Sequence, residues 1–271
     1  MITIGIPSAG RVDKLLKCVE SIDINTKINY TFVIIDNSIK KISSHERLSN
    51  NDIQVIRPKI PLSPSASREL IGRIATTEYI LYIDEDMTVS KRSIDRLFNF
   101  LVHNENVSVV GGFLIEGMYE YPIAYRFGFG YKKNQKNIWK IPIRKSGLIR
   151  LGIDRCQSDF IHPPFLIRSK VLKKISFDKN YQWGSELLDF FLGCYDKGIA
   201  VMSLTDVPFF HFPGKYTENT HKSNAINNNI MGKKYFQKKW NLKVVLPKTT
   251  LVEFFTERIK KRIWFNMVRN K

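Results

Sequence analysis

The sequence has few cysteines, few glycines and prolines, and no long apolar run. Its three cysteines in 271 residues are widely spaced and form no CxxC pair, so we expect no disulfide framework and no structural zinc site. The chain has only 15 glycines and 11 prolines, and 43% of its residues are hydrophobic. This composition excludes a collagen-like or disordered chain. No apolar run approaches the roughly 18 residues of a membrane span. The first residues predict a strand rather than a signal peptide, so we expect a cytoplasmic protein.

Acidic residues are also in the minority. Lysine and arginine number 43 against 25 acids, which gives a formal charge of +18. This charge favours an anionic partner, whether nucleic acid, a phosphorylated small molecule or an acidic membrane surface. A non-catalytic protein that binds nucleic acid or another polyanion is therefore one hypothesis. Against it, the basic residues are spread along the chain and no known nucleic-acid-binding motif is present.

The first half of the chain alternates strand and helix patterns. Four short apolar runs predict buried strands, at residues 2–6, 30–35, 53–56 and 79–83. A helical pattern follows at 12–22, Ser65 or Ser67 is expected to cap a second helix, and Ser90 a third. This alternation predicts an α/β fold with a mostly parallel sheet covered by helices. Ligands in such sheets bind beyond the carboxyl ends of the strands.

The second half has a different pattern. Every odd position from 123 to 131 is bulky, and 139–143 alternate likewise, which predicts a long β-hairpin with one aromatic face. We expect that face to pack into the core rather than to form a ligand platform. The remaining segments are expected to be a helix at 186–197, a strand at 199–204, a loop at 209–213 around His211, and a polar surface at 219–229.

The C-terminal segment 249–271 is basic and amphipathic. Apolar side chains recur every four residues among its lysines and arginines: Leu251, Phe255, Ile259, Ile263 and Met267. Such a helix can lie in an anionic membrane interface. It can equally dock on its own domain with its basic face in water, and the sequence leaves both interpretations open.

Three consecutive acids, Asp84, Glu85 and Asp86, close the apolar run at 79–83. Carboxylates this close repel one another unless a cation neutralises them. Their hard oxygen atoms suit Mg²⁺ or Mn²⁺, which often share such ligands with substrate phosphates. The alternative is an exposed turn before the next helix, where acids also favour the helix dipole.

Several segments in order resemble the GT-A glycosyltransferases of family 2 and their relatives. The resemblance is carried by Ile4-Gly5-Ile6-Pro7-Ser8, by 34–38, by 65–72, by 78–86, by Trp183-Gly184-Ser185-Glu186 and by His211. It implies a GT-A fold, with a Rossmann-like, mostly parallel sheet flanked by helices, a β-hairpin insertion and a C-terminal helical tail. The implied domains are a catalytic unit at 1–248, divided into a nucleotide-sugar half (1–114) and an acceptor half (115–248), followed by the helix at 249–271.

The resemblance also implies roles for individual residues. The donor-binding residues would be Pro7, Ser8, Asp36, Arg68, Asp84 and Glu85. Asp36 would bind the nucleotide base, and Arg68 would approach the diphosphate, for which a guanidinium offers paired donors. Asp84 to Asp86 matches the DxD motif of the family. Asp86 and His211 would hold a divalent metal, Mn²⁺ or Mg²⁺, which stabilises the departing diphosphate.

Trp183 would contact the acceptor, and a carboxylate would take the proton of the acceptor hydroxyl. Many inverting relatives have adjacent Glu-Asp here, whereas in this chain Leu187 follows Glu186 and the next acid is Asp189. Either Glu186 or Asp189 is the base, or the enzyme retains configuration. We favour inversion with Glu186. The alternative is an acid that only stabilises the helix N-terminus.

The sequence thus predicts a metal-dependent glycosyltransferase that uses a nucleotide-sugar, with a UDP-sugar favoured. The expected acceptor is a hydroxyl of a glycan or lipid-linked molecule in cell-surface polysaccharide synthesis. In the first of the two interpretations of residues 249–271, this segment holds the protein at the anionic inner face of the membrane. No nucleic acid is expected as a partner.

Overall fold

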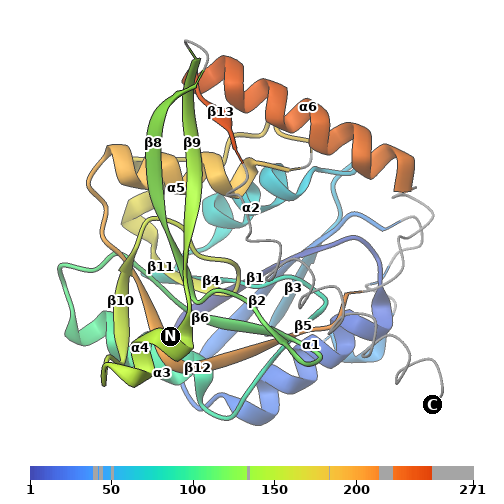
Figure 1. Cartoon of the computed structure of the whole chain (residues 1–271). Coiled ribbons are helices and arrows are strands. Elements are labelled where there is room, and N and C mark those ends of the chain that lie inside the picture. Colours follow the sequence, from blue (N-terminus) through green and yellow to red (C-terminus); the bar gives the residue numbers. More distant parts are fainter. Residues whose placement is uncertain are drawn as a thin grey trace.

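The molecule is organised around one large β-sheet with helices on both faces (Figure 1). The computed structural model describes residues 1–38, 42, 45–49, 52–132, 135–182, 184–213 and 222–245, and only the backbone of 49, 132 and 222–228. Within these residues ten strands form the main sheet and three form a second, smaller sheet.

The first half of the chain contributes seven strands and three helices: β1 (Ile2–Ser8), α1 (Val12–Asn25), β2 (Tyr30–Asp36), a short 3-10 helix (Glu46–Ser49), β3 (Ile53–Ile56), α2 (Pro64–Ile74), β4 (Tyr79–Tyr82), β5 (Met87–Val89), α3 (Ser93–His103), β6 (Val109–Glu116) and β7 (Tyr119–Glu120). The second half contributes the remaining elements: β8 (Ala124–Lys132), β9 (Gln135–Ile143), α4 (Lys145–Arg150), β10 (Arg155–Ser158), β11 (Phe165–Arg168), a 3-10 helix (Ser169–Lys173), α5 (Glu186–Asp196), β12 (Val201–His211), α6 (Lys222–Trp240) and β13 (Lys243–Val244).

Six strands of the main sheet point in the same direction. Its path runs β10-β12-β6-β11-β4-β1-β2-β3, with β5 and β7 paired at the side to β12 and β6. β1, β2, β3 and β4 are parallel, as are β6 and β12, while β11 is antiparallel to both of its neighbours. The predicted mostly parallel sheet is confirmed, and the carboxyl ends of these six strands meet at one edge.

Both faces of the sheet are buried. Phe32 and Ile34 of β2 pack in the core cluster that α1 and α3 cover. Val33 and Ile35, which alternate with them, pack in the cluster that α2 and α5 cover. Because both faces need apolar side chains, the strands are continuous apolar runs, and this is why the sequence identified them.

The start of α2 differs from the expected one. Its N-cap is Ser63, whose hydroxyl accepts a hydrogen bond from the backbone N–H of Ala66 at 3.2 Å. Pro64 follows as the first helical residue, a position where its missing N–H costs nothing. The expected caps, Ser65 and Ser67, are buried inside the helix.

The start of α3 was also predicted incorrectly. The residue before the helix is Arg92, in the left-handed region at φ 64°, and it makes no side-chain cap. The hydroxyl of Ser90 instead lies 2.6 Å from that of Ser93 and donates to the carbonyl of Pro208 at 3.2 Å. Ser90 therefore ties α3 to β12 rather than capping the helix.

β8 and β9 form the predicted hairpin, and β13 joins β9 at its far edge. The expectation of one aromatic face is only partly correct. Trp139 lies opposite Gly128, on the other face from Phe127, and covers Gly128 and Gly130. A Cβ atom at Gly128 would lie 2.2 Å from the indole nitrogen of Trp139, so only glycine fits beneath this ring.

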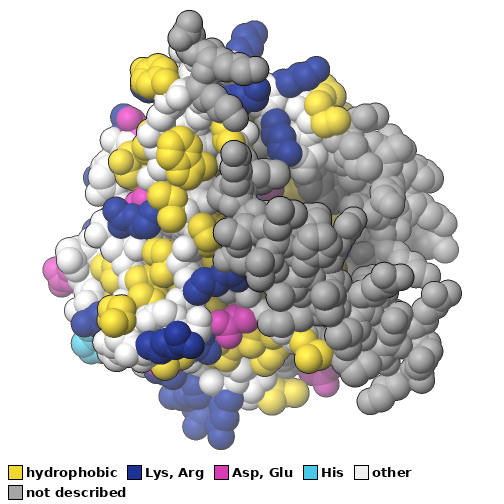
Figure 2. Space-filling view, viewed as in Figure 1, with side chains coloured by type: hydrophobic (Ala, Val, Ile, Leu, Met, Phe, Trp, Pro, Cys, Tyr) yellow, Lys and Arg dark blue, Asp and Glu magenta, His cyan; other side chains and the backbone are white. Residues whose placement is uncertain are grey.

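Phe127 and Phe129 stand on the same face of the hairpin but differ in burial. Phe127 is 8% exposed and its ring contacts Tyr195 of α5, whereas Phe129 is 40% exposed. Figure 2 shows hydrophobic side chains at the surface on this side of the molecule, with lysines and arginines among them. The buried end of the face therefore packs into the core, as predicted, and the outer end does not.

The Phe127→Ala variant is expected to lose about 3 kcal/mol of unfolding free energy, because it leaves a cavity under the hairpin. Urea unfolding measures this loss. Phe129→Ala is the matched control and should lose much less. A Phe127→Ala protein of normal stability that uses its acceptor poorly would instead show that the face is a ligand platform.

Two segments of the second half are more regular than expected. His211 lies on a strand, not in a loop, because β12 continues through it and pairs with β5, with His211 opposite Met87. The Asn-rich stretch was expected to be irregular surface, but from residue 222 onward it belongs to α6, whose Phe236 is buried. Residues 249–271 lie outside the described residues. None of the described helices combines the length and apolar character needed to cross a bilayer.

Candidate active site

Polar side chains gather at the edge where the six parallel strands end. Ser8 ends β1 and pairs in register with Asp36, which ends β2. β4 flanks β1 on the other side and leads directly into Asp84, Glu85 and Asp86. His211 reaches the same edge because it ends β12, and its neighbour Phe212 donates its backbone N–H to the carbonyl of Asp86 at 2.8 Å.

Asp36 is buried and both of its oxygen atoms are engaged. Oδ1 accepts from the backbone N–H and the hydroxyl of Ser38, and Oδ2 accepts from Nη1 of Arg57 at 2.9 Å. Pro7, one residue before the end of β1, is half-buried beside it. A ligand at this end of β2 would meet a fixed carboxylate–guanidinium pair, and sequence analysis missed its arginine.

Arg68 lies on α2, is 3% exposed, and stands between two carboxylates. Its Nη2 donates to Oδ1 of Asp84 at 2.7 Å, and its Nη1 lies 3.6 Å from Oε1 of Glu186. Its Nε and Nη1 are buried and make no hydrogen bond within the described residues. A buried unpaired donor costs about 1–3 kcal/mol. These two donors therefore indicate a ligand rich in acceptor oxygen atoms, such as a phosphate.

Glu186 is the first residue of α5 and faces Arg68. Gly184 and Ser185 both have positive φ, 79° and 66°, so the chain turns sharply into the helix. This turn brings the carboxylate of Glu186 to Arg68, the side chain that also pairs with Asp84 after β4. The preceding Trp183 lies outside the described residues, so its acceptor role stays a prediction.

Asp189, one turn further along α5, faces a different set of groups. Its carboxylate accepts hydrogen bonds from the hydroxyl of Tyr181 at 3.2 Å, the indole of Trp240 at 2.7 Å and the ammonium of Lys239 at 3.0 Å. It is buried among these partners. Asp189 therefore joins α5 to α6, and its carboxylate has no contact with Arg68 or with the acids at 84–86.

Glu85 is the most enclosed of the three acids, at 1% exposed. Its Oε2 accepts from the hydroxyl of Ser8 at 2.6 Å, and its Oε1 accepts from Nε of Arg11 at 2.7 Å. Both carboxylate oxygen atoms thus hold the loop after β1. This arrangement fixes the position of Ser8. Because both oxygen atoms of Glu85 are taken, Glu85 influences a ligand indirectly, by positioning Ser8 and Arg11.

Asp86 and His211 form the centre of a chain of polar contacts. Oδ2 of Asp86 accepts from Nη1 of Arg11 at 2.8 Å and lies 3.5 Å from Nε2 of His211. On the other side of the ring, Nδ1 of His211 lies 3.3 Å from Oε2 of Glu116, to which Tyr121 donates at 2.6 Å. Glu116 ends β6, the parallel neighbour of β12. The imidazole is therefore held between two carboxylates.

The two partners shift each other's pKa. Burial alone would lower the pKa of His211, but its hydrogen bond with Asp86 and the charges of Asp86 and Glu116 raise it overall. Burial alone would raise the pKa of Asp86, but His211 and Arg11 lower it overall. The site without a metal thus favours an ionised carboxylate beside a protonated imidazole.

The donor set fits a divalent cation that is shared with a ligand. Within the described residues no three His, Cys, Asp or Glu side chains gather closely enough to hold a metal alone. Mg²⁺ commonly takes one or two protein carboxylates and completes its shell with water and substrate phosphates. Asp86 supplies one carboxylate, and His211 places an imidazole nitrogen 3.5 Å from it as a second ligand of another type. Glu116 behind the imidazole matches the carboxylate that usually orients a metal-bound histidine.

A cavity lies on the α1 side of Asp86. Its volume is about 570 Å³, and its walls come from α1, β5 and Phe212. Among the predicted site residues Asp86 alone lines it, whereas Asp36, Arg68 and Glu186 do not. The cavity therefore adjoins the site at Asp86, the acid that best fits the role of a metal ligand.

Three site residues were missed from the sequence: Arg11, Arg57 and Glu116. Glu116 had a usable signal, because it ends an apolar strand as Asp36 does. Arg11 also had a usable signal, because it is a basic residue that follows the first strand at the carboxyl edge of the sheet. Arg57 gave no signal, because its contact with Asp36 depends on how β3 lies beside β2.

Comparison with known proteins identifies the family and the fold of this chain. The sequence model of the family described as glycosyl transferase family 2 matches residues 3–175. The chain belongs to this family. The family segment includes β1, β2 and the acids after β4, and it ends before α5 and His211.

The glycosyl transferase family 2 assignment agrees with a likeness to a solved structure. The fold resembles that of GalNAc-T7, solved with UDP, GalNAc and Mn²⁺, with a TM-score of 0.64 and 16% sequence identity. The match covers 82% of this chain and 45% of that one, so the chain spans less than half of its neighbour. No curated protein matches the sequence significantly. The predicted family and the GT-A fold are confirmed.

Proposed function

We propose that this family 2 protein transfers a sugar from a nucleoside diphosphate sugar, with UDP favoured, to an acceptor hydroxyl, with inversion at the sugar carbon. One observation carries the proposal: buried Arg68 stands between Asp84 and Glu186, and two of its donors make no hydrogen bond to any residue that the structure describes. A diphosphate would satisfy those donors and would be placed beside a carboxylate able to accept a proton. UDP is favoured because the GalNAc-T7 structure contains UDP and Mn²⁺.

The donor lies along the carboxyl edge of β2, β1 and β4 in this proposal. The base stands at Asp36 with Pro7 as a wall, and the ribose approaches Asp84. Arg68 binds the diphosphate through Nε and Nη1 of its guanidinium. Glu85 keeps Ser8 in place beneath the ribose, through the 2.6 Å hydrogen bond between them.

Asp86 and His211 hold the divalent cation, Mn²⁺ or Mg²⁺. When bound, the cation supplies positive charge where the departing diphosphate gains negative charge, and it needs no proton donor. Glu116 fixes the orientation of the imidazole, which binds in its neutral form. The contacts that raise the pKa of His211 favour its protonated form, so a divalent cation would compete with a proton for this nitrogen.

Glu186 is the base of the transfer step. Its carboxylate takes the proton of the acceptor hydroxyl as the new oxygen–carbon bond forms. The bond from the sugar carbon to the phosphate oxygen breaks on the opposite side, and its electron pair leaves with the nucleoside diphosphate. Arg68 holds the carboxylate of Glu186 in the site, with its Nη1 3.6 Å from Oε1 of Glu186. Asp189 is already held by Lys239 and Trp240, so we assign it to anchoring α6.

The acceptor is a hydroxyl of a glycan or lipid-linked molecule, and Trp183 contacts it. The net charge of +18 supports an anionic or membrane-bound acceptor, as in cell-surface polysaccharide synthesis at the inner face of the membrane.

Deleting residues 249–271 is expected to remove binding to anionic vesicles while the metal-dependent binding of UDP remains. The reason is that this basic amphipathic segment supplies both charge and apolar side chains to a lipid surface. Vesicle sedimentation with phosphatidylglycerol measures the effect, and neutral phosphatidylcholine vesicles are the control. Equal sedimentation of the full and shortened chains would show that the segment has another role.

The proposed activity is tested by incubating the protein with UDP-, GDP- and ADP-sugars and Mn²⁺, and measuring the nucleoside diphosphate released. We expect release from a UDP-sugar that EDTA stops and an acceptor hydroxyl accelerates. Release from no donor, or release that EDTA does not change, would contradict the proposal. The configuration of the product by NMR tests inversion separately, and a retained anomer would overturn that part alone.

A further inference from the structure

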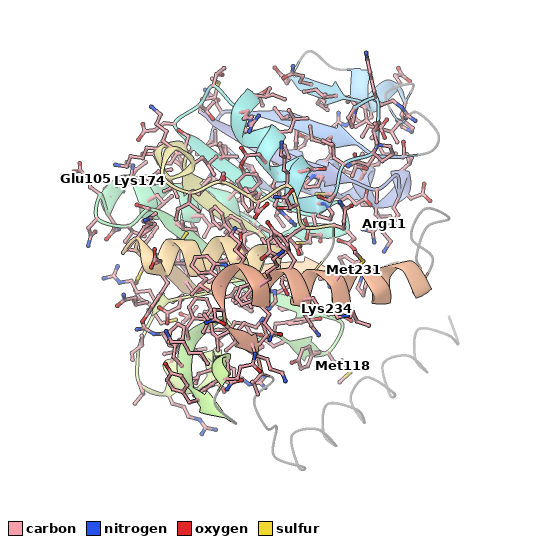
Figure 3. All side chains as sticks on the ribbon, turned by 90° about the horizontal axis from the view of Figure 1, so that it is seen from above. Arg11, Glu105, Met118, Lys174, Met231 and Lys234 are labelled. Carbon is pink, nitrogen blue, oxygen red and sulfur yellow. The ribbon has the colours of Figure 1, made fainter. Side chains whose placement is uncertain are left out.

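Arg11 stands in the loop between β1 and α1, at the carboxyl edge of the sheet (Figure 3). Gly10 before it has φ +93°, and a Cβ atom there would lie 2.5 Å from Cβ of Ser38. The loop thus packs closely against the end of β2. This close packing keeps Arg11 within reach of the acids that follow β4.

The guanidinium of Arg11 bridges two of the three acids. Its Nε donates to Glu85 at 2.7 Å and its Nη1 donates to Oδ2 of Asp86 at 2.8 Å. Arg68 meanwhile pairs with Asp84, and Lys14 donates to the backbone carbonyl of Phe212. Arg11 is therefore the arginine that neutralises the proposed metal ligand when no metal is bound.

A divalent cation and Arg11 compete for the same oxygen. A metal bound through Oδ2 of Asp86 has to displace Nη1 of Arg11, and the two positive charges repel each other across a short distance. Glu85 is 1% exposed and also bound by Ser8, so it can keep Nε while Nη1 leaves. The Arg11 side chain is 26% exposed and so has room to move. Diphosphate oxygen atoms would attract both cations and relieve this repulsion.

We propose that Arg11 is a positioning residue that occupies the cation position at Asp86 until the diphosphate of the donor arrives, and so restricts metal binding to the donor-bound enzyme. This inference rests on the proposed function, because it requires Asp86 to be a metal ligand. Metal and donor then bind cooperatively. The coupling is reciprocal, so each tightens the binding of the other by the same factor.

The test is Mn²⁺ binding to the full chain, measured by the electron paramagnetic resonance signal of free Mn²⁺, with and without UDP. We compare the wild type with Arg11→Gln, which removes the charge. Arg96→Gln is the matched control, because Arg96 pairs with Asp206 at the surface, outside the site. Arg11→Lys keeps the charge but cannot bridge two carboxylates, and it serves as the second variant if Arg11→Gln does not fold.

We expect Arg11→Gln to bind Mn²⁺ alone about tenfold more tightly than the wild type, because the metal no longer displaces a charge-assisted hydrogen bond. The factor by which UDP tightens Mn²⁺ binding should fall correspondingly. Arg11→Lys should lie between the two, and Arg96→Gln should match the wild type. Equal Mn²⁺ affinity in the wild type and both Arg11 variants would overturn the inference and leave the proposed function intact. Absence of Mn²⁺ binding in every protein, with and without UDP, would overturn both.

Discussion

Replacing Asp86 with alanine is expected to lower the rate of metal-dependent sugar transfer by at least ~1,000-fold. Metal stabilisation of a departing diphosphate contributes several kcal/mol, and each ~1.4 kcal/mol corresponds to a factor of ten in rate. The substitution also removes the carboxylate that holds His211, at 3.5 Å, in the site. The measurement is the initial rate of UDP release at saturating Mn²⁺ and donor.

A matched control separates chemistry from folding in this experiment. Asp206→Ala removes an acid that pairs with Arg96 at the surface, and we expect its transfer rate to equal that of the wild type. Thermal unfolding of both variants shows whether the fold is intact. Metal-dependent transfer by folded Asp86→Ala within tenfold of the wild-type rate would remove Asp86 from the metal site.

Replacing Glu186 with glutamine is expected to lower the transfer rate at least ~100-fold while UDP binds as before. Glutamine keeps the size of the side chain but cannot accept the proton of the acceptor hydroxyl, and a positioned base contributes roughly 10²–10⁴ in rate. Arg68 retains its hydrogen bond to Asp84, at 2.7 Å, so the diphosphate site stays formed. Single-turnover kinetics measure the transfer, and calorimetry with UDP and Mn²⁺ measures the binding.

Asp189→Asn is the matched comparison for Glu186→Gln. We expect it to lower the free energy of unfolding, because Lys239 loses one of the two carboxylates that it pairs with and keeps only its contact with Asp178. Its transfer rate should stay close to that of the wild type. A folded Asp189→Asn protein that loses the rate, with Glu186→Gln unaffected, would assign the base to Asp189.

The sheet could be predicted because its strands are buried on both faces. Strands such as β1 and β4 contain hardly any polar residue. Each can therefore be recognised from its own segment, without knowing which strands lie beside it. The edge of the site followed directly, because parallel strands end together and Ser8, Asp36 and Asp84 each stand at such an end.

The remaining contacts depend on pairings between segments far apart in the chain. His211 was expected in a loop, yet β12 continues through it, with His211 opposite Met87 of β5 and Phe210 opposite Ile115 of β6. The same pairing places Glu116 behind the imidazole. Periodicity in one segment carries no information on such a partner, so Arg57 could not be assigned from its own surroundings, and Glu116 could be assigned to the edge of the sheet but not to His211.

Local polarity was also a poor guide to α6. Its first turns are rich in asparagine, which favours turns over helices. The later part of the helix is fixed by tertiary contacts, since Phe236 is buried and Trp240 and Lys239 bind Asp189. Packing of this end outweighs the weak helix propensity of the beginning.

The most direct test of the account is the thermal stability of the protein with UDP, GDP and ADP, each with and without Mn²⁺. A ligand at about 100 times its Kd stabilises the folded state by ~2.7 kcal/mol, which is readily measured. The account predicts that UDP together with Mn²⁺ stabilises the protein and that either ligand alone has little effect. The reason is that Arg68 binds the negatively charged diphosphate and Asp86 binds the positively charged metal of the same complex. Failure of every nucleotide to stabilise the protein, or equal stabilisation with and without Mn²⁺, would contradict it.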